Sequence, residues 1–306
     1  MKNLIIIGAM KSGTGTLDES LNSHPNISMA KGKEINFFLS SHFRGADRDI
    51  YENNFEISEN TQLLGEACPV YSIHGLQKGL PQKISEKFPD AKILYIVREP
   101  FKRLVSHYAH NVRVGRTSKG LYDEVINSPE YMLTSYYAYN LKQYKKYFND
   151  VRVEFFEELV SDNSNTLTDI CNWLELPPYS FETKEEHKNK RPNQLPIKDK
   201  SPIVFQFLKF FRGGSLSSVI PRAWKETIVS LMTKGKSLDS NSQEFIEESK
   251  RLQEIAQPIL DEWTVELDLL TDGKASKVWI KDNVEPSNFL SESTSWKRVL
   301  EKSLIN

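Results

Sequence analysis

A loop of small and hydroxyl-bearing residues near the start of the chain has the composition of an anion site. The sequence GAMKSGTGT spans residues 8–16, after the apolar run 3–8 and before a stretch with helical spacing. Where a strand leads through such a loop into a helix, backbone N–H groups and the positive end of the helix dipole converge. The pattern predicts a phosphate held by Lys11, Ser12, Gly13, Thr14, Gly15 and Thr16.

A second candidate anion site follows another apolar run. Arg98 comes directly after residues 91–97, and Ser106 lies eight residues further on, within a predicted helix over 101–113. A guanidinium and a short hydroxyl can together bind a phosphate group. Two anion sites on adjacent strand–helix units predict a ligand that carries two phosphate groups.

A kinase that uses ATP and Mg²⁺ is an alternative interpretation of the first loop. The nucleotide triphosphatase signature GxxxxGK[ST] places its lysine after the second glycine, whereas Lys11 precedes Gly13. Arg98 also stands where an acidic Mg²⁺ ligand would be expected. The histidines show no zinc-ligand spacing. We therefore expect a ligand held by cations and hydroxyls, without a metal.

The elements that must position these residues alternate between strands and helices. Apolar runs at 3–8 and 91–97 predict strands covered on both faces, and VRVEFF at 151–156 predicts a further strand through a weak alternation of apolar and polar residues. Helical spacing is predicted at 75–88, 101–113, 129–148, 162–174 and 241–270. The fold class is therefore α/β, with a P-loop-like parallel β-sheet flanked by helices on both faces. We expect one domain over 1–280, with a tail at 281–306.

Residues 177–202 contain five prolines and the charged run KEEHKNKR, so they are expected to form a surface loop over the site. The 306 residues carry 40 Lys+Arg against 41 Asp+Glu, which gives no global positive field for nucleic acid. Cys68 and Cys171 are expected to be free thiols in a reducing compartment. The apolar stretch LIIIGAM is too short to cross a membrane. A cytoplasmic location is therefore expected, and the oligomeric state is not assigned.

Several blocks resemble the sulfotransferases that use 3′-phosphoadenosine 5′-phosphosulfate (PAPS). The segment KSGTGTL at 11–17 is similar to that family's 5′-phosphosulfate loop, and IVREPFKRLVSHYAHNVRVGR at 96–116 is similar to its 3′-phosphate block. Further similar blocks follow in the family's order: SHPNI, KEINFF, GEACPVYS, YYAYNLKQYKKYF, VEFFEELVSD and HKNKRPN. The resemblance covers roughly residues 3–280 and implies the family's fold and its donor, PAPS.

The block KEINFF resembles the carbohydrate sulfotransferases, in particular the heparan-type enzymes and their bacterial relatives. That resemblance implies Glu34 as the catalytic base. The resemblance of the 5′-phosphosulfate loop implies Lys11 as the group that stabilises the leaving phosphate, and that of the basic loop around 184–193 implies Lys190 and Arg191 as donor contacts in a closing segment. This chain has Asn36 and Leu39 where those enzymes often carry His and Asp, and Ala67 where they carry a basic residue. These departures weaken the expectation of a heparan-like acceptor.

The resemblance implies transfer of a sulfuryl group to an acceptor hydroxyl, on a carbohydrate or a glycolipid. Partial burial by Ile35, Phe37 and Phe38 is expected to hold the pKa of the Glu34 base near the working pH. A simple surface pairing of Glu34 with Lys31 or Lys33 is the alternative role for that residue. A catalytically inactive sulfotransferase fold that only binds ligand is the non-enzymatic alternative.

Overall fold

The computed structural model describes residues 1–32, 34–39, 48–73, 79–181, 194–198 and 235–279. The chain divides into two compact units. The first comprises Met1–Leu104, Ser128–His187 and Gln253–Asn306, and the second comprises Val105–Asn127 and Lys188–Leu252. The prediction of one domain over 1–280 stays a prediction.

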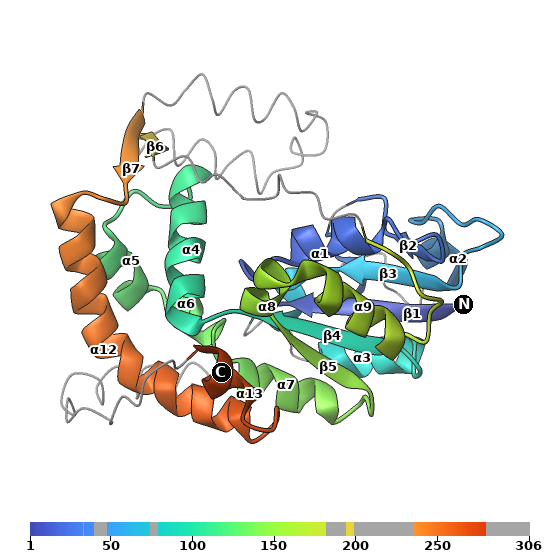
Figure 1. The fold of residues 1–306 in the computed structure, drawn as a ribbon. Helices are drawn as coiled ribbons and strands as arrows, with labels where there is room; N and C mark the ends of the chain where they lie inside the picture. The colour runs from blue at the N-terminus through green and yellow to red at the C-terminus, as the bar shows by residue number, and fades with distance from the viewer. Residues whose placement is uncertain (33, 40–47, 74–78, 182–193, 199–234, 280–306) are drawn as a thin grey trace. The chain divides into compact units, whose positions relative to one another are not determined.

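The first unit is built on a five-stranded parallel sheet, in the order β2-β3-β1-β4-β5 (Figure 1). The strands are β1 (Lys2–Gly8), β2 (Ile27–Met29), β3 (Leu63–Ala67), β4 (Lys92–Val97) and β5 (Val151–Phe155). The chain leaves the central β1 first toward β2 and β3 and later toward β4 and β5. Such a reversal of direction creates a crevice at the carboxyl ends of the strands, which is where ligands bind in open α/β sheets.

Helices cover both faces of this sheet. Its helical elements are α1 (Thr14–Leu21), η1 (Phe37–Leu39), α2 (Arg48–Glu52), η2 (Pro69–Ser72), α3 (Leu80–Lys87), α6 (Glu130–Leu133), α7 (Tyr137–Lys145), α8 (Phe156–Ser161), α9 (Asn163–Trp173) and α13 (Lys274–Trp279). Helix α4 (Pro100–Arg113) begins in this unit, and α12 (Gln243–Asp268) ends in it. The predicted fold class is confirmed.

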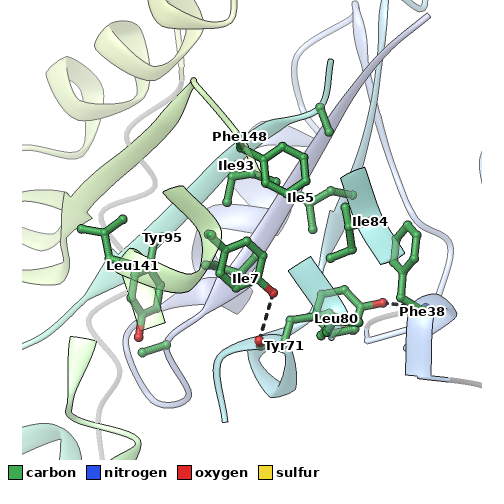
Figure 2. Close-up of a cluster of buried hydrophobic side chains, with 14 of the residues drawn as sticks. Ile5, Ile7, Phe38, Tyr71, Leu80, Ile84, Ile93, Tyr95, Leu141 and Phe148 are labelled. Atoms are coloured by element: carbon green, nitrogen blue, oxygen red, sulfur yellow. Dashed lines mark hydrogen bonds between the residues drawn. The ribbon is translucent and has the colours of Figure 1, made fainter. Parts of the chain in front are cut away.

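The alternation of side chains along β1 divides the apolar core into two layers. Leu4 and Ile6 pack with side chains of α1, α8 and α9. Ile5 and Ile7 face the other way, toward α3, α7 and the aromatic residues around Tyr71, as Figure 2 shows. Because successive strand residues point to opposite faces, a continuous apolar run serves both layers.

Three of the five strands were predicted, β1 and β4 from continuous apolar runs and β5 from the weak alternation in VRVEFF, and β2 and β3 were not. β2 has only three residues, and β3 carries Gly65 and Glu66 in the sequence LLGEA. Both are buried all the same, and β2 pairs with β3, which pairs in turn with β1. Their hydrogen-bonding partners, rather than their own composition, determine that they are strands.

The helices at 101–113, 162–174 and 241–270 are confirmed as α4, α9 and α12. The predicted helix over 129–148 is instead two helices, α6 and α7, separated by residues 134–136. The Ser135 hydroxyl lies in this break, where it accepts a hydrogen bond from Arg103 at 2.6 Å and donates to the Pro100 carbonyl at 3.2 Å. These tertiary contacts interrupt the helical spacing that the sequence indicates.

The second unit contains the remainder of α4, α5 (Leu121–Asn127), the start of α12, and an antiparallel pair formed by β6 (Gln194–Lys198) and β7 (Gly235–Asp239). The Leu121 N–H donates to Glu248 of α12 at 2.8 Å, and the Arg251 guanidinium lies 3.9 Å from the centre of the Tyr122 ring. Strand β6 falls inside the segment 177–202 that was predicted as a loop. Pro196 fits a strand with a single partner, since it needs no second hydrogen-bonded neighbour.

Candidate active site

The loop after β1 has the structure of an anion-binding turn. Gly13 (φ +87°) is the N-cap residue of α1 and has no side chain with which to cap the helix, whose first N–H groups point out of the helix end. The Ser12 side chain is fully buried, and its hydroxyl has no hydrogen-bond partner in the described part of the chain. An orphaned hydroxyl beside an uncapped helix start fits a phosphate group. Lys11 lies half-buried in the same loop.

Arg98 comes from the neighbouring strand and meets this loop. Its Nη1 donates to the Lys11 carbonyl at 3.3 Å, and its guanidinium lies 4.7 Å from the centre of the Phe156 ring. The Arg98 carbonyl accepts a hydrogen bond from the Tyr137 hydroxyl at 2.7 Å. The structure therefore brings the two predicted phosphate blocks together at the ends of the adjacent strands β1 and β4.

Ser106 lies on α4, half-buried, in the portion of the helix that belongs to the second unit. Its pairing with Arg98 stays a prediction. Lys190 and Arg191 lie outside the described residues, as does nearly all of the predicted closing loop around them. Their roles also stay predictions.

Phe156 links the two predicted phosphate blocks, and the sequence did not single it out. A Cβ atom on Gly13 would lie 2.7 Å from Cδ2 of the Phe156 ring. The same ring lies against the Arg98 guanidinium. Glycine is thus required at position 13 both for its left-handed backbone and for the close approach of Phe156.

Replacing Gly13 with alanine should destabilise the protein more than the same change at Gly79. Both glycines have left-handed φ, +87° and +71°, so each alanine incurs a backbone cost of roughly 1–2 kcal/mol. Among the described residues only the alanine at position 13 meets an atom, because none of them lies within 4 Å of the Cβ position at Gly79. The clash should add roughly 1–3 kcal/mol. Equal losses of free energy of unfolding in urea titrations would contradict this account of the Gly13 contact.

Arg103 is a fully buried cation behind the first loop. It donates hydrogen bonds to the Ser135 hydroxyl at 2.6 Å, to the Met10 carbonyl at 3.5 Å and to the Tyr131 carbonyl. Burial lowers the pKa of its guanidinium. Arg103 thereby ties the loop before Lys11 to α6. In the sequence it is one of several charged residues of a helix, and nothing there marks it as buried.

Glu34 lies in the connection that follows β2, with its side chain exposed and its backbone left-handed (φ +60°). The expected partial burial is wrong, because Phe37 and Phe38 turn into the core and leave the Glu34 carboxylate in solvent. Among the described residues, no ion pair joins Glu34 to Lys31. Lys33 lies outside the described residues.

A second glutamate, Glu66 on β3, is the buried carboxyl of this region. It is fully covered, and its Oε1 accepts hydrogen bonds from the Tyr71 hydroxyl at 2.5 Å and the Phe37 N–H at 3.4 Å. Burial raises the pKa of Glu66 to about 7, although these hydrogen bonds oppose the rise. The Glu66 carboxyl also faces Tyr51 and Cys68, whose own pKa values are raised by burial and by the charge of Glu66.

The raised pKa of Glu66 predicts a specific pH dependence of stability. Between pH 4.5 and about 7, the folded state keeps a proton that the unfolded state has lost, so stability should fall as pH rises through this range. Glu66→Gln should remove up to roughly 3 kcal/mol of this change. Urea titrations of both proteins at pH 5 and pH 8 measure the effect. Parallel pH profiles for the two proteins would show that Glu66 titrates normally.

Lys11, Glu34 and Arg98 share one edge of the sheet. Each follows the carboxyl end of a parallel strand, β1, β2 and β4 respectively. Ala67, which stands where the resemblance implies a basic residue, is the buried last residue of β3. Cys68 and Cys171 are free and buried, as predicted. Within the described residues, no cluster of His, Cys, Asp or Glu side chains could hold a metal ion.

Known proteins share sequence and fold with this chain. Residues 1–212 match the family described as "Sulfotransferase domain". Human heparan sulfate glucosamine 3-O-sulfotransferase 5 is 30% identical over 188 residues, which cover 57% of this chain and 53% of that protein. The membrane-associated sulfotransferase kil1 of Dictyostelium discoideum is 34% identical over 116 residues, covering 37% of this chain and 24% of that protein. The chain thus spans about half or less of these curated relatives.

A solved structure shares the fold. The sulfotransferase from Alicyclobacillus acidocaldarius aligns with a TM-score of 0.53 and 24% identity, covering 86% of this chain and 98% of that one. No helix in the described ranges has the length and apolar character needed to span a membrane. The match over 1–212 takes in every described residue of the two phosphate blocks and of the Glu34 segment. The chain therefore belongs to the sulfotransferase family.

Proposed function

We propose that this protein transfers a sulfuryl group from PAPS to a hydroxyl group of a carbohydrate or glycolipid. The observation that carries the proposal is the contact between Arg98 Nη1 and the Lys11 carbonyl, 3.3 Å, which joins two cationic loops at adjacent strand ends. PAPS has a phosphate at each of two positions, so it needs two such loops. The orphaned Ser12 hydroxyl supports an anion in the first of them.

The first loop would bind the 5′-phosphosulfate. Backbone N–H groups at the start of α1, with the Ser12, Thr14 and Thr16 hydroxyls, would hold its oxygens. Lys11 would stabilise the negative charge that develops on the 5′-phosphate as the sulfur–oxygen bond breaks. Arg98, with Ser106, would bind the 3′-phosphate and so select this nucleotide over ATP. Lys190 and Arg191 complete the proposed donor contacts.

Glu34 would accept the proton of the acceptor hydroxyl as its oxygen attacks sulfur. The exposed carboxylate is open to a large acceptor at the carboxyl edge of the sheet. A carbohydrate acceptor is supported by the curated relatives, of which one is named for the 3-O-sulfation of heparan sulfate glucosamine. Alignment of hydroxyl, sulfur and leaving oxygen would supply most of the rate.

Thermal denaturation tests the donor site. The product 3′-phosphoadenosine 5′-phosphate (PAP), at about a hundredfold over its Kd, should stabilise the protein by about 2.7 kcal/mol and raise its Tm. ADP should raise the Tm less at the same concentration, and Arg98→Ala should remove the advantage of PAP. Stabilisation by ATP only with Mg²⁺ would contradict the proposal and favour a kinase.

A further inference from the structure

Three consecutive backbone amides just after Glu34 each donate to a side chain from residues 66–71. The pairs are the Asn36 N–H with Cys68 Sγ at 3.3 Å, the Phe37 N–H with Glu66 Oε1 at 3.4 Å, and the Phe38 N–H with the Tyr71 hydroxyl at 3.1 Å. We call Glu66, Cys68 and Tyr71 the acceptor clamp, because their side chains accept these three hydrogen bonds. The name does not refer to the acceptor hydroxyl of the transfer reaction. Side chains rather than a neighbouring strand therefore hold this stretch of backbone.

The members of the acceptor clamp are buried and bonded to one another and to the turn. The Tyr71 hydroxyl donates to Glu66 Oε1 at 2.5 Å, and the Cys68 thiol donates to Asn36 Oδ1 at 3.2 Å. None of the three clamp residues has measurable solvent exposure. Removing a buried acceptor leaves its amide unpaired at a high cost, so the clamp gives the turn one defined position.

The turn that the clamp holds has two left-handed residues that are not glycine. Glu34 has φ +60° and Asn36 has φ +52°, and Asn36 Nδ2 donates to the Glu34 carbonyl at 2.8 Å. Such residues persist where surrounding contacts fix them, and they gather at functional sites. Because the Glu34 side chain is exposed, the backbone of this turn fixes where that side chain starts and in which direction its Cα–Cβ bond points.

We infer that the acceptor clamp positions Glu34 for proton abstraction. The inference rests on the proposed function, in which Glu34 is the base. A base must lie within hydrogen-bond reach of the proton it takes, and a displacement of about 1 Å can lower a rate roughly a hundredfold. Asn36, where heparan-type relatives often carry histidine, thereby acts as the link between the Glu34 carbonyl and Cys68. The clamp residues are positioning residues and do not touch the substrate.

Tyr71→Phe tests the inference, because it removes the acceptor of the Phe38 amide and keeps the aromatic ring. We expect kcat to fall roughly 10- to 100-fold, with the KM for PAPS and the Tm shift by PAP unchanged. Hydrogen exchange at the Phe37 and Phe38 amides should become faster. Tyr95→Phe is the matched control: Tyr95 is equally buried in the same core layer (Figure 2), and its hydroxyl bonds Asn140 instead.

Two substitutions of Glu66, one conservative and one not, provide a second test of the inference. Glu66→Gln keeps an oxygen that can accept from the Phe37 amide, so its kcat should stay within a few-fold of the wild type, whereas Glu66→Ala should behave like Tyr71→Phe. A purely structural role would lower stability in both variants without separating kcat from KM.

The possible outcomes distinguish a failure of the inference about the acceptor clamp from a failure of the proposed function. Faster amide exchange in Tyr71→Phe with unchanged kcat would overturn the inference and leave the proposed function intact. Equal behaviour of Tyr71→Phe and Tyr95→Phe in both measurements would overturn it as well. A wild-type protein that binds PAP and transfers nothing would overturn the proposed function, and with it the catalytic purpose of the clamp.

Discussion

Glu34→Gln is expected to lower kcat for sulfuryl transfer by roughly 10²- to 10⁴-fold, the usual contribution of a general base. The amide has nearly the same size as the carboxylate but cannot accept the proton of the acceptor hydroxyl. Because the Glu34 side chain is exposed, the change should leave the free energy of unfolding almost unaltered. The Tm shift caused by PAP should also persist, since Glu34 belongs to neither phosphate block.

Glu59→Gln is the matched control, because Glu59 is another exposed carboxylate in the connection between β2 and β3. It should retain wild-type kcat. If Glu34→Gln retained full transfer activity, Glu34 would not be the base. His24 would then need to be tested, although its ring is buried against Tyr179 and Phe181 and bonds the Pro177 carbonyl.

Lys11→Ala should lower kcat by roughly 10²- to 10³-fold, comparable to the loss of one donor that stabilises developing charge. The positive charge acts on the leaving phosphate, so its removal should slow the reaction more than it weakens PAP binding. Steady-state kinetics with PAPS, read beside the Tm shift by PAP, separates these two effects.

Lys83→Ala, which removes an exposed lysine from α3, should leave both measurements unchanged. Equal losses of PAP affinity and of kcat/KM in Lys11→Ala, with unchanged kcat, would assign Lys11 to ground-state binding alone. Its proposed role in stabilising the leaving phosphate would then be wrong.

The sequence predicts those strands of the sheet whose own residues show a pattern typical of a strand. β1 and β4 are runs of apolar residues that serve both core layers, whereas β5 turns Val151, Val153 and Phe155 toward one layer. These patterns are visible without knowledge of the partner strands. β2 and β3 become strands because they pair with neighbours, and the break between α6 and α7 depends on Arg103, which reaches it from α4. Contacts between residues distant in sequence override local spacing in both cases.

In the candidate site, too, the residues with a local pattern were predicted and those that depend on contacts distant in the sequence were not. Lys11 and Arg98 were found because each stands at the end of an apolar run, where parallel strands bring loops together. Glu34 was reached only through a family resemblance, and its expected burial was wrong because the aromatic residues beside it pack into the core. Phe156 and Arg103 were not singled out, and the residues of the acceptor clamp were seen only as part of the family-like block GEACPVYS, since the contacts of all these residues join segments that are distant in the sequence.

The most direct test of the account is transfer itself. PAPS should be incubated with a panel of glycan and glycolipid acceptors, with and without a metal chelator, while PAP release and acceptor mass are followed. We predict one PAP for each sulfuryl group gained by an acceptor hydroxyl, an unchanged rate with chelator, and loss of both products in Lys11→Ala. Phosphorylation of an acceptor by ATP and Mg²⁺, or tight PAP binding without transfer to any hydroxyl, would contradict the account.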